Sequence, residues 1–188
     1  MGLDEMKVLL DGVKDIQRQL GKDHITIQEF AAEVQDDPGQ KFKSQEELLK
    51  TVTKMIYQDI NPKLHLVFPE SIITPEAEAV NIVAYTSGLC SFNPGSWDGK
   101  RPGNFYLNLE GFRNFRKFEL LSLVLHESNP GHNFNAAFLA RCGLPKFLVF
   151  APYRRLSATP SNFPIYTAYE EGWGLYAESL GEVMGLFK

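Results

Sequence analysis

Two histidines and a glutamate lie within seven consecutive residues, HESNPGH, from His126 to His132. In many zinc hydrolases an apolar helix presents a His-Glu pair and a second histidine. The imidazoles hold the metal, and the glutamate takes a proton from the water bound to it. The usual spacing of the histidines is four residues, but here it is six, which turns the second ring about 120° away on a regular helix. Pro130 and Gly131 lie between them, and both residue types interrupt helices. The pattern therefore predicts a broken helix whose histidines share one zinc ion, with Glu127 as general base.

A third protein ligand is needed if one position on the metal is to stay open for water. Glu171 is the candidate, because it begins a helical stretch that places Glu178 seven residues later on nearly the same face. Glu178 could then orient one of the histidines through a hydrogen bond. In the alternative reading, Glu170, Glu171 and Glu178 form a solvated helix face, and His126 and His132 pack as ordinary histidines.

Four other side chains are candidates for contact with substrate or transition state. An oxyanion needs a donor besides the metal, and Tyr176, Tyr169 and Tyr106 are candidates by residue type. Arg101 could bind a substrate carboxylate as a bidentate partner. The tyrosines could equally be core or rim aromatics, and the arginine a solvated loop charge.

The elements that must position these residues are mostly helical. Apolar residues recur at three- and four-residue intervals over residues 3–20. Capping-box pairs predict two more helices, which begin after Thr26 and after Ser44. Further helices are predicted over residues 115–126, from after Gly131 to Cys142, and over about 168–184.

The middle of the chain has a different character. Short runs rich in β-branched and aromatic residues, 80–85 and 105–109, predict a small strand pair. The Pro- and Gly-rich stretch 91–103 between them predicts a long ordered loop. We therefore expect one mainly α-helical domain with a small β element. Its three portions are a helical scaffold (1–62), a strand-and-loop portion on the substrate side (63–114) and the metal-site helices (115–188).

Length and composition narrow the function classes. The 188 residues have 19 basic and 23 acidic side chains and a formal net charge of −4. We see no extended basic face, which argues against nucleic acid as a partner. Apolar runs are too short for a membrane span, and no signal peptide is visible, so the compartment is left open. Two cysteines, Cys90 and Cys142, exclude a multi-disulfide framework and an all-cysteine zinc site.

Three stretches in the second half of the chain resemble the family called domain of unknown function 885. They are DGKRPGNFYLN from Asp98 to Asn108, HESNPGH over residues 126–132, and EGWGLYAE over residues 171–178. The corresponding family patterns are RPGxFYxN, HExxPGH and EGWxxYxE. All three occur here in the same order.

This resemblance implies a helical, zincin-like metallopeptidase core with a zinc cofactor. It implies that His126, His132 and Glu171 are the metal ligands and that Glu127 is the general base. Family members are usually several hundred residues long, and this chain resembles a middle portion of them. We therefore expect a fragment with an incomplete cleft.

The leading hypothesis is a zinc-dependent peptide hydrolase, or its metal-binding core, with a peptide as substrate. The alternative is a non-catalytic, truncated helical paralogue that acts as a binding or interaction protein. Metal-free acid-base chemistry by His126 and Glu127 is a third reading, but it leaves His132 and Glu171 without a role. The sequence indicates no oligomeric state.

Overall fold

The computed structural model describes residues 2–96, 98, 100–144 and 167–187. The chain divides into two compact units, Met1–Lys41 and Phe42–Lys188. The described residues are mainly helical and include a small three-stranded sheet. The predicted fold class is thereby confirmed. No helix among the described residues is both long and apolar enough to cross a membrane.

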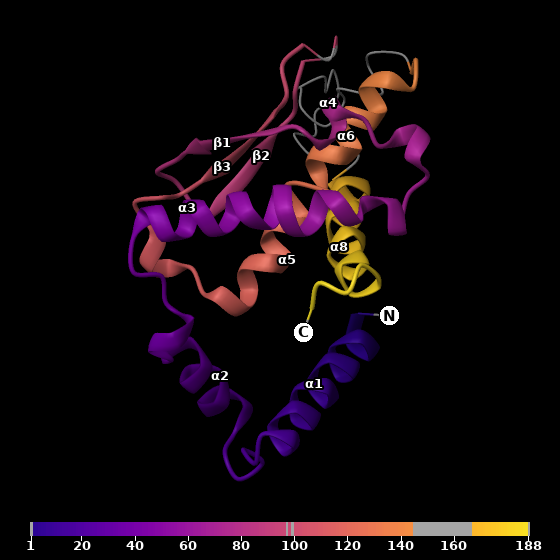
Figure 1. The fold of residues 1–188 in the computed structure, drawn as a ribbon. Helices are drawn as coiled ribbons and strands as arrows, with labels where there is room; N and C mark the ends of the chain where they lie inside the picture. Colours follow the sequence, from indigo (N-terminus) through magenta and orange to yellow (C-terminus); the bar gives the residue numbers. More distant parts are fainter. Residues whose placement is uncertain (1, 97, 99, 145–166, 188) are drawn as a thin grey trace, which may run out of the picture. The chain divides into compact units, whose positions relative to one another are not determined.

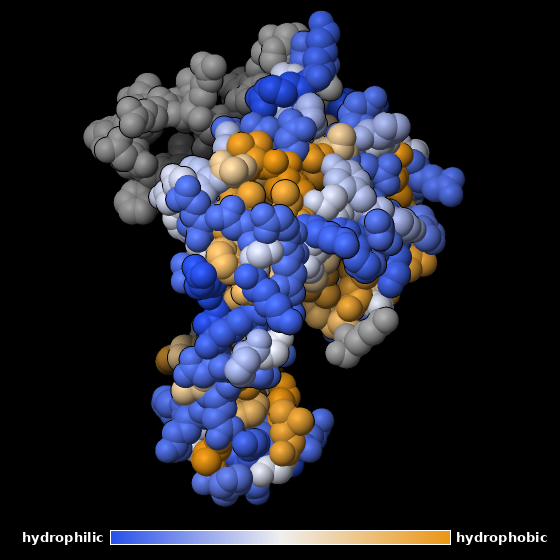
Figure 2. All heavy atoms as spheres, turned by 60° about the vertical axis from the view of Figure 1, so that its left-hand side comes forward, coloured by the Kyte–Doolittle hydropathy of each residue, from blue (hydrophilic) through white to orange (hydrophobic). Residues whose placement is uncertain are grey.

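The first unit contains helices α1 (Gly2–Gln19) and α2 (Ile27–Asp36) and a 3-10 turn, Pro38–Gln40. The predicted capping box at the start of α2 is confirmed. The amide of Glu29 donates to Oγ1 of Thr26 at 3.2 Å, and the amide of Thr26 donates to Oε2 of Glu29 at 2.8 Å. Apolar side chains of α1 remain exposed on the surface of this unit, seen as orange spheres in the lower part of Figure 2.

The second unit is built around helices from both of its ends (Figure 1). Helix α3 (Gln45–Lys54) continues through a π-helical turn (Met55–Ile60) into a 3-10 helix (Asn61–Leu66). Helix α8 (Thr167–Val183), near the other end of the chain, packs on α5 (Lys117–Glu127) and α6 (His132–Arg141). The short elements are α4 (Pro75–Glu78) and the 3-10 turns Glu70–Ile72 and Phe112–Asn114.

The sheet has the order β1-β3-β2. Strands β1 (Val80–Ala84) and β3 (Gly103–Leu107) arise from the two predicted runs, and they pair in parallel. The sequence analysis missed a third strand, β2 (Cys90–Asn93), which pairs antiparallel with β3. The stretch 91–103, predicted to be a loop throughout, is therefore strand until Asn93. Its apolar content is too low to mark a strand, and pairing of Phe92 with Phe105 supplies what the local sequence lacks.

The core of the second unit is formed by side chains of the sheet and of the helices. Strand β3 alternates between buried and half-buried positions, so that Phe105 and Leu107 face inward with none of their surface exposed. They belong to one cluster with Leu48, Ile56, Leu125 and Phe134, all at most 1% exposed. Because this cluster includes Leu125, the residue before His126, the end of α5 is held by the core.

Candidate metal centre

The helix that carries His126 ends immediately after it. Helix α5 stops at Glu127, and α6 begins at His132, so the break falls between the two histidines. At Gly131 a Cβ atom would run into the backbone carbonyl oxygens of Leu125 and His126. A residue without a side chain is therefore required where the chain turns back against the end of α5.

Buried asparagines hold this turn in place. The Nδ2 of Asn129 donates to Oδ1 of Asn61 at 2.8 Å and to the carbonyl of Glu78 at 3.0 Å. The Nδ2 of Asn133 lies 2.9 Å from Oδ1 of Asn129 and 3.1 Å from the carbonyl of Ala77. Sequence reasoning missed both asparagines. Polar amides flanking Pro-Gly between two apolar helices were the available signal, because such groups are buried only when they are hydrogen-bonded.

The turn and α8 bring His126, His132 and Glu171 together. Nε2 of His126 lies 3.3 Å from Oε2 of Glu171, and Nε2 of His132 lies 3.9 Å from the same oxygen. One ligand atom from each residue lies within 4.8 Å of the other two. The histidine side chains are 16% and 12% exposed, whereas that of Glu171 is 57% exposed. The cluster therefore has two buried nitrogen donors and a carboxylate that faces solvent.

Glu178 contacts the other nitrogen of His126. Its Oε1 lies 2.9 Å from Nδ1 of the imidazole. A carboxylate at that distance favours the tautomer in which Nδ1 carries the proton, so Nε2 keeps a free lone pair directed at Glu171. Glu178 thus contacts His126 at Nδ1, and Glu171 lies near its Nε2. Both carboxylates come from α8.

Two further residues of α8 fix the helix against the turn. The indole Nε1 of Trp173 donates to the carbonyls of Pro130 and Gly131, at 2.9 and 3.2 Å. At Gly174 a Cβ atom would lie 2.6 Å from Nε2 of His126, so the imidazole packs directly on the helix backbone. Together these contacts explain why tryptophan and glycine follow Glu171 at this spacing.

Glu127 lies beside the cluster, between two hollows that it helps to line. One, of about 200 Å³, is also lined by Ser91, Phe92, His132, Glu170 and Glu171. The other, of about 260 Å³, is also lined by Leu89, Glu119, Ser122, Leu123, His126 and Glu178. Sγ of Cys90 lies 3.6 Å from Oε1 of Glu127. Sequence reasoning missed this thiol contact, and a lone cysteine 37 residues upstream carries no signal for it.

Burial sets the protonation tendencies of these groups. Burial raises the pKa of Glu127, and the nearby His126 partly offsets the rise. Burial also lowers the pKa of His132, which favours the neutral imidazole that a metal requires. Glu170 has a pKa raised to about 7 by burial and by the adjacent charge of Glu171. Two carboxyl groups that line the hollow beside His132, Glu127 and Glu170, therefore have raised pKa values.

A model of the family described as "Bacterial protein of unknown function (DUF885)" matches residues 1–188. The chain belongs to the DUF885 family. The three stretches on which the resemblance rested supply the β3 strand, the α5–α6 turn and the middle of α8. No curated protein matches this DUF885 chain.

A solved structure with the same fold comes from Colwellia psychrerythraea, where the protein is described as a candidate lipoprotein. The two are 25% identical with a TM-score of 0.82, and the alignment covers 100% of the DUF885 chain. It covers 31% of the Colwellia chain, so the present chain spans about a third of that protein's length.

The remaining candidates of the sequence analysis lie elsewhere in the DUF885 chain. Tyr176 is 53% exposed, and the centroid of its ring lies 5.8 Å from that of Trp173. The ring centroids of Tyr106 and Tyr85 are 5.3 Å apart. Arg101 donates from its guanidinium to the carbonyl of Pro94 at 3.1 Å. Neither these two tyrosines nor Arg101 lines either hollow beside Glu127.

The donor set of the cluster fits a zinc ion by its chemistry. Two imidazole nitrogens and one carboxylate are a common three-ligand set for zinc and leave a fourth position open. Bonds of 2.0–2.1 Å in a tetrahedral site put ligand atoms about 3.4 Å apart. The distances from Oε2 of Glu171 to the two histidines, 3.3 and 3.9 Å, bracket that separation. The exposed Glu171 side chain is the one with freedom to adjust.

Proposed function

We propose that this chain is the metal-binding core of a zinc-dependent peptide hydrolase. The observation that supports the proposal most is the convergence of Glu171 from α8 with His126 and His132 from the α5–α6 turn. The contact of Glu178 with the second nitrogen of His126 adds to it, because ligating histidines typically donate that N–H to a carboxylate.

Each residue of the proposed site has a separate role. His126, His132 and Glu171 would hold the ion, which supplies a Lewis acid and a water of lowered pKa. Glu127, next to His126 in sequence, accepts the proton of the attacking water and returns it to the leaving amine. Its raised pKa suits the second transfer, because a weaker acid holds the proton until the leaving group takes it.

Strand β2 gives the substrate a place to lie. It is one of the two edge strands of the described sheet, beside β3. Its residues Ser91 and Phe92 line the hollow at His132, and Leu89 just before it lines the hollow at His126. A peptide paired with the open edge of β2 would pass both hollows and Glu127.

A non-catalytic, truncated paralogue that binds a partner is the second candidate. It is favoured by the position of Tyr106, Tyr169 and Tyr176, none of which lines either hollow, because the described lining then offers no tyrosine hydroxyl to a developing oxyanion. The alignment covers 31% of the solved neighbour's chain. We therefore propose peptide hydrolysis for a longer protein that contains this chain, and metal binding for the chain itself.

Zinc titration with variants tests the metal site. We expect the chain to bind one zinc ion, and His126→Ala or Glu171→Ala to lose most of that affinity. His65→Ala removes an exposed histidine elsewhere and serves as the matched control. Equal zinc affinity in His126→Ala, Glu171→Ala and the unaltered chain would show that these residues are not metal ligands.

Catalysis is tested separately by Glu127→Gln in a longer DUF885 relative. The amide keeps the size of the side chain but cannot accept a proton, so turnover of peptides should disappear while zinc content stays. For the 188-residue chain we expect weak or no hydrolysis. Chelator-sensitive cleavage by the chain alone would contradict that expectation, and full activity of Glu127→Gln would remove Glu127 from the mechanism.

A further inference from the structure

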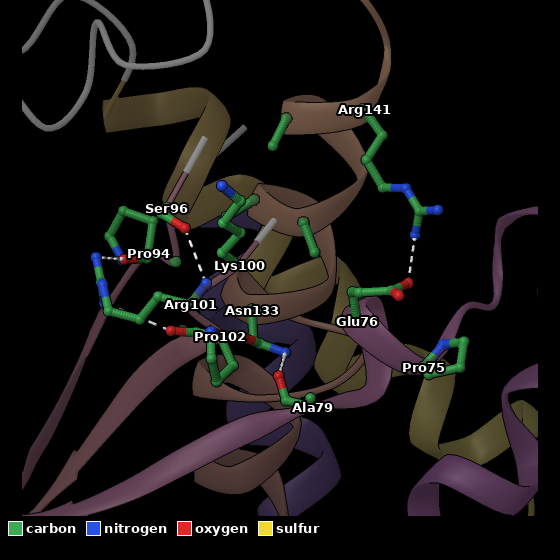
Figure 3. A pocket seen from close by; sticks show the side chains of 15 residues that line it. Pro75, Glu76, Ala79, Pro94, Ser96, Lys100, Arg101, Pro102, Asn133 and Arg141 are labelled. Carbon is green, nitrogen blue, oxygen red and sulfur yellow. Dashed lines mark hydrogen bonds and ion pairs between the residues drawn. The ribbon is translucent and has the colours of Figure 1, made fainter. Parts of the chain in front are cut away.

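A cavity of about 290 Å³ lies on another side of α6, shown in Figure 3. It is lined by residues of α4, of α6 and of the stretches 94–96 and 100–103. None of its lining residues lines the two hollows beside Glu127. The volume is at the small end of the range for small-molecule sites, roughly 300–1,000 Å³. It therefore suits a ligand of few atoms.

Small apolar side chains form the walls. Four alanines and three prolines contribute: Ala79, Ala136, Ala137, Ala140, Pro75, Pro94 and Pro102. Alanines on α6 leave room that larger side chains would fill, and prolines keep the opposite wall stiff. The body of a fitting ligand is accordingly apolar and compact.

The charged residues of the cavity give it a positive balance. Three basic residues, Lys100, Arg101 and Arg141, and one acid, Glu76, line it, and Lys100 also pairs with Asp98 at 3.7 Å. The whole chain, in contrast, has a formal charge of −4. Arg141 is 3.0 Å from Glu76, whereas the guanidinium of Arg101 donates to two backbone carbonyls, which leave its charge unbalanced. The cavity therefore favours an anion.

A buried asparagine, Asn133, is part of the cavity lining. Asn133 is 2% exposed, and its Nδ2 lies 3.1 Å from the carbonyls of Ala77 and Ala79. These acceptors fix the orientation of the amide, so the oxygen faces the other way. No described residue donates a hydrogen bond to that oxygen. It lies close to Gly103, where a Cβ atom would run into it, so glycine is needed beside it.

We propose that this cavity binds a carboxylate next to a secondary amide, the chemistry of an N-acylated amino acid. The ligand's N–H donates to Oδ1 of Asn133, its apolar side chain packs on the alanines of α6, and its carboxylate lies near Lys100 and Arg101. The carboxyl end of a peptide and a free N-acyl amino acid share this chemistry.

Binding measurements with chosen probes test the proposal without any turnover. N-acetyl-leucine, its carboxamide and the peptide acetyl-Ala-Ala-Leu are titrated by calorimetry or by amide chemical shifts. We expect the acid to bind more tightly than the carboxamide. Tighter binding of the tripeptide than of the acid assigns the site to peptide ends, and equal binding assigns it to N-acyl amino acids. Equal affinity of acid and carboxamide overturns the proposal.

Two variants locate the binding. Ala140→Leu fills the cavity and should abolish binding of all three probes, whereas unchanged binding overturns the proposal. Lys100→Gln removes an 85% exposed charge, which Asp98 at 3.7 Å offsets only in part, and should reduce the preference for acid over carboxamide about two- to fivefold. Lys50→Gln, an exposed lysine on α3 outside the cavity, makes the same charge change and should leave that preference as it is. An equal effect of Lys100→Gln and Lys50→Gln also overturns the proposal.

Discussion

His126 is the residue on which most of the proposed metal centre depends. Its Nε2 faces Glu171, its Nδ1 contacts Glu178, and Gly174 lies against its ring. An imidazole held on both nitrogens and on one face loses little further freedom when it binds an ion. Pre-organisation of this kind strengthens binding by lowering the entropy lost on ordering.

Replacement of Glu178 tests this pre-organisation. We expect Glu178→Ala to weaken zinc binding roughly 10- to 100-fold, because the carboxylate orients His126 and raises the basicity of its free nitrogen. A competition titration against a zinc chelator measures the change. Glu182→Ala, an exposed residue of the same helix, should have no such effect. Equal affinities of the two variants would mean that Glu178 has no part in the site.

The two cysteines differ in their expected reactivity. Cys142 is exposed, whereas Cys90 is half-buried beside Glu127. Burial and the neighbouring carboxylate raise the pKa of Cys90, so little thiolate forms there. Iodoacetamide at neutral pH should therefore label Cys142 well before Cys90, as mass spectrometry of digested protein will report. Faster labelling of Cys90 would contradict the burial of its thiol.

At the scale of elements, α8 is the helix that completes the metal centre. It supplies Glu171 and Glu178, and its glycines let it approach α5 closely. Gly181 follows Gly174 by about two turns on the same face of α8. A Cβ atom there would lie 2.6 Å from Cδ1 of Leu125. Close packing at both points fixes the rotation of α8, and hence the direction of its carboxylates.

Two glycines of α8 form a matched pair for testing this packing. Gly174→Ala places a methyl group on the imidazole of His126, and we expect it to displace the ring, to weaken zinc binding and to cost about 1–3 kcal/mol of stability. Gly172→Ala meets nothing within 4 Å and should be neutral or stabilise the helix by up to about 1 kcal/mol. Thermal unfolding and zinc titration compare them. Equal behaviour would show that α8 does not pack on His126.

At the scale of the whole molecule, the chain is two units with unequal roles. All three proposed ligands, both hollows and the cavity on α6 belong to the unit from Phe42 onward. The first unit has two helices, and large apolar residues of α1 stay exposed, including Leu3 at 83% and Val8 at 64%. The second unit, in contrast, has a continuous buried core.

Deletion of residues 2–40 tests that division. We expect the shortened chain to fold and to bind zinc with unchanged affinity. Zinc at 100 times its dissociation constant should then stabilise it by about 2.7 kcal/mol, because only the folded form has the site. Circular dichroism melts with zinc and with chelator measure this difference. A shortened chain without a cooperative transition would mean that the second unit depends on the first.

The sequence alone determined the local features of this protein. The capping pairs at Thr26 and Ser44 predicted where α2 and α3 begin, and both are observed. Pro130 and Gly131 predicted the break between the histidines. The three motifs identified the family, which the match over residues 1–188 confirms. These features depend on backbone preferences and spacing within a few residues, and such information is complete in the sequence.

The tertiary structure decided which distant residues share a site. It separated Arg101, Tyr106 and Tyr176 from the hollows beside Glu127, although their types suited the chemistry. It added strand β2, and it showed the support of the turn by Asn129 and Asn133. The asparagine contacts, for example, join residues that are 56 and 68 positions apart in the sequence. Such contacts form only when the whole core packs, so no local pattern encodes them.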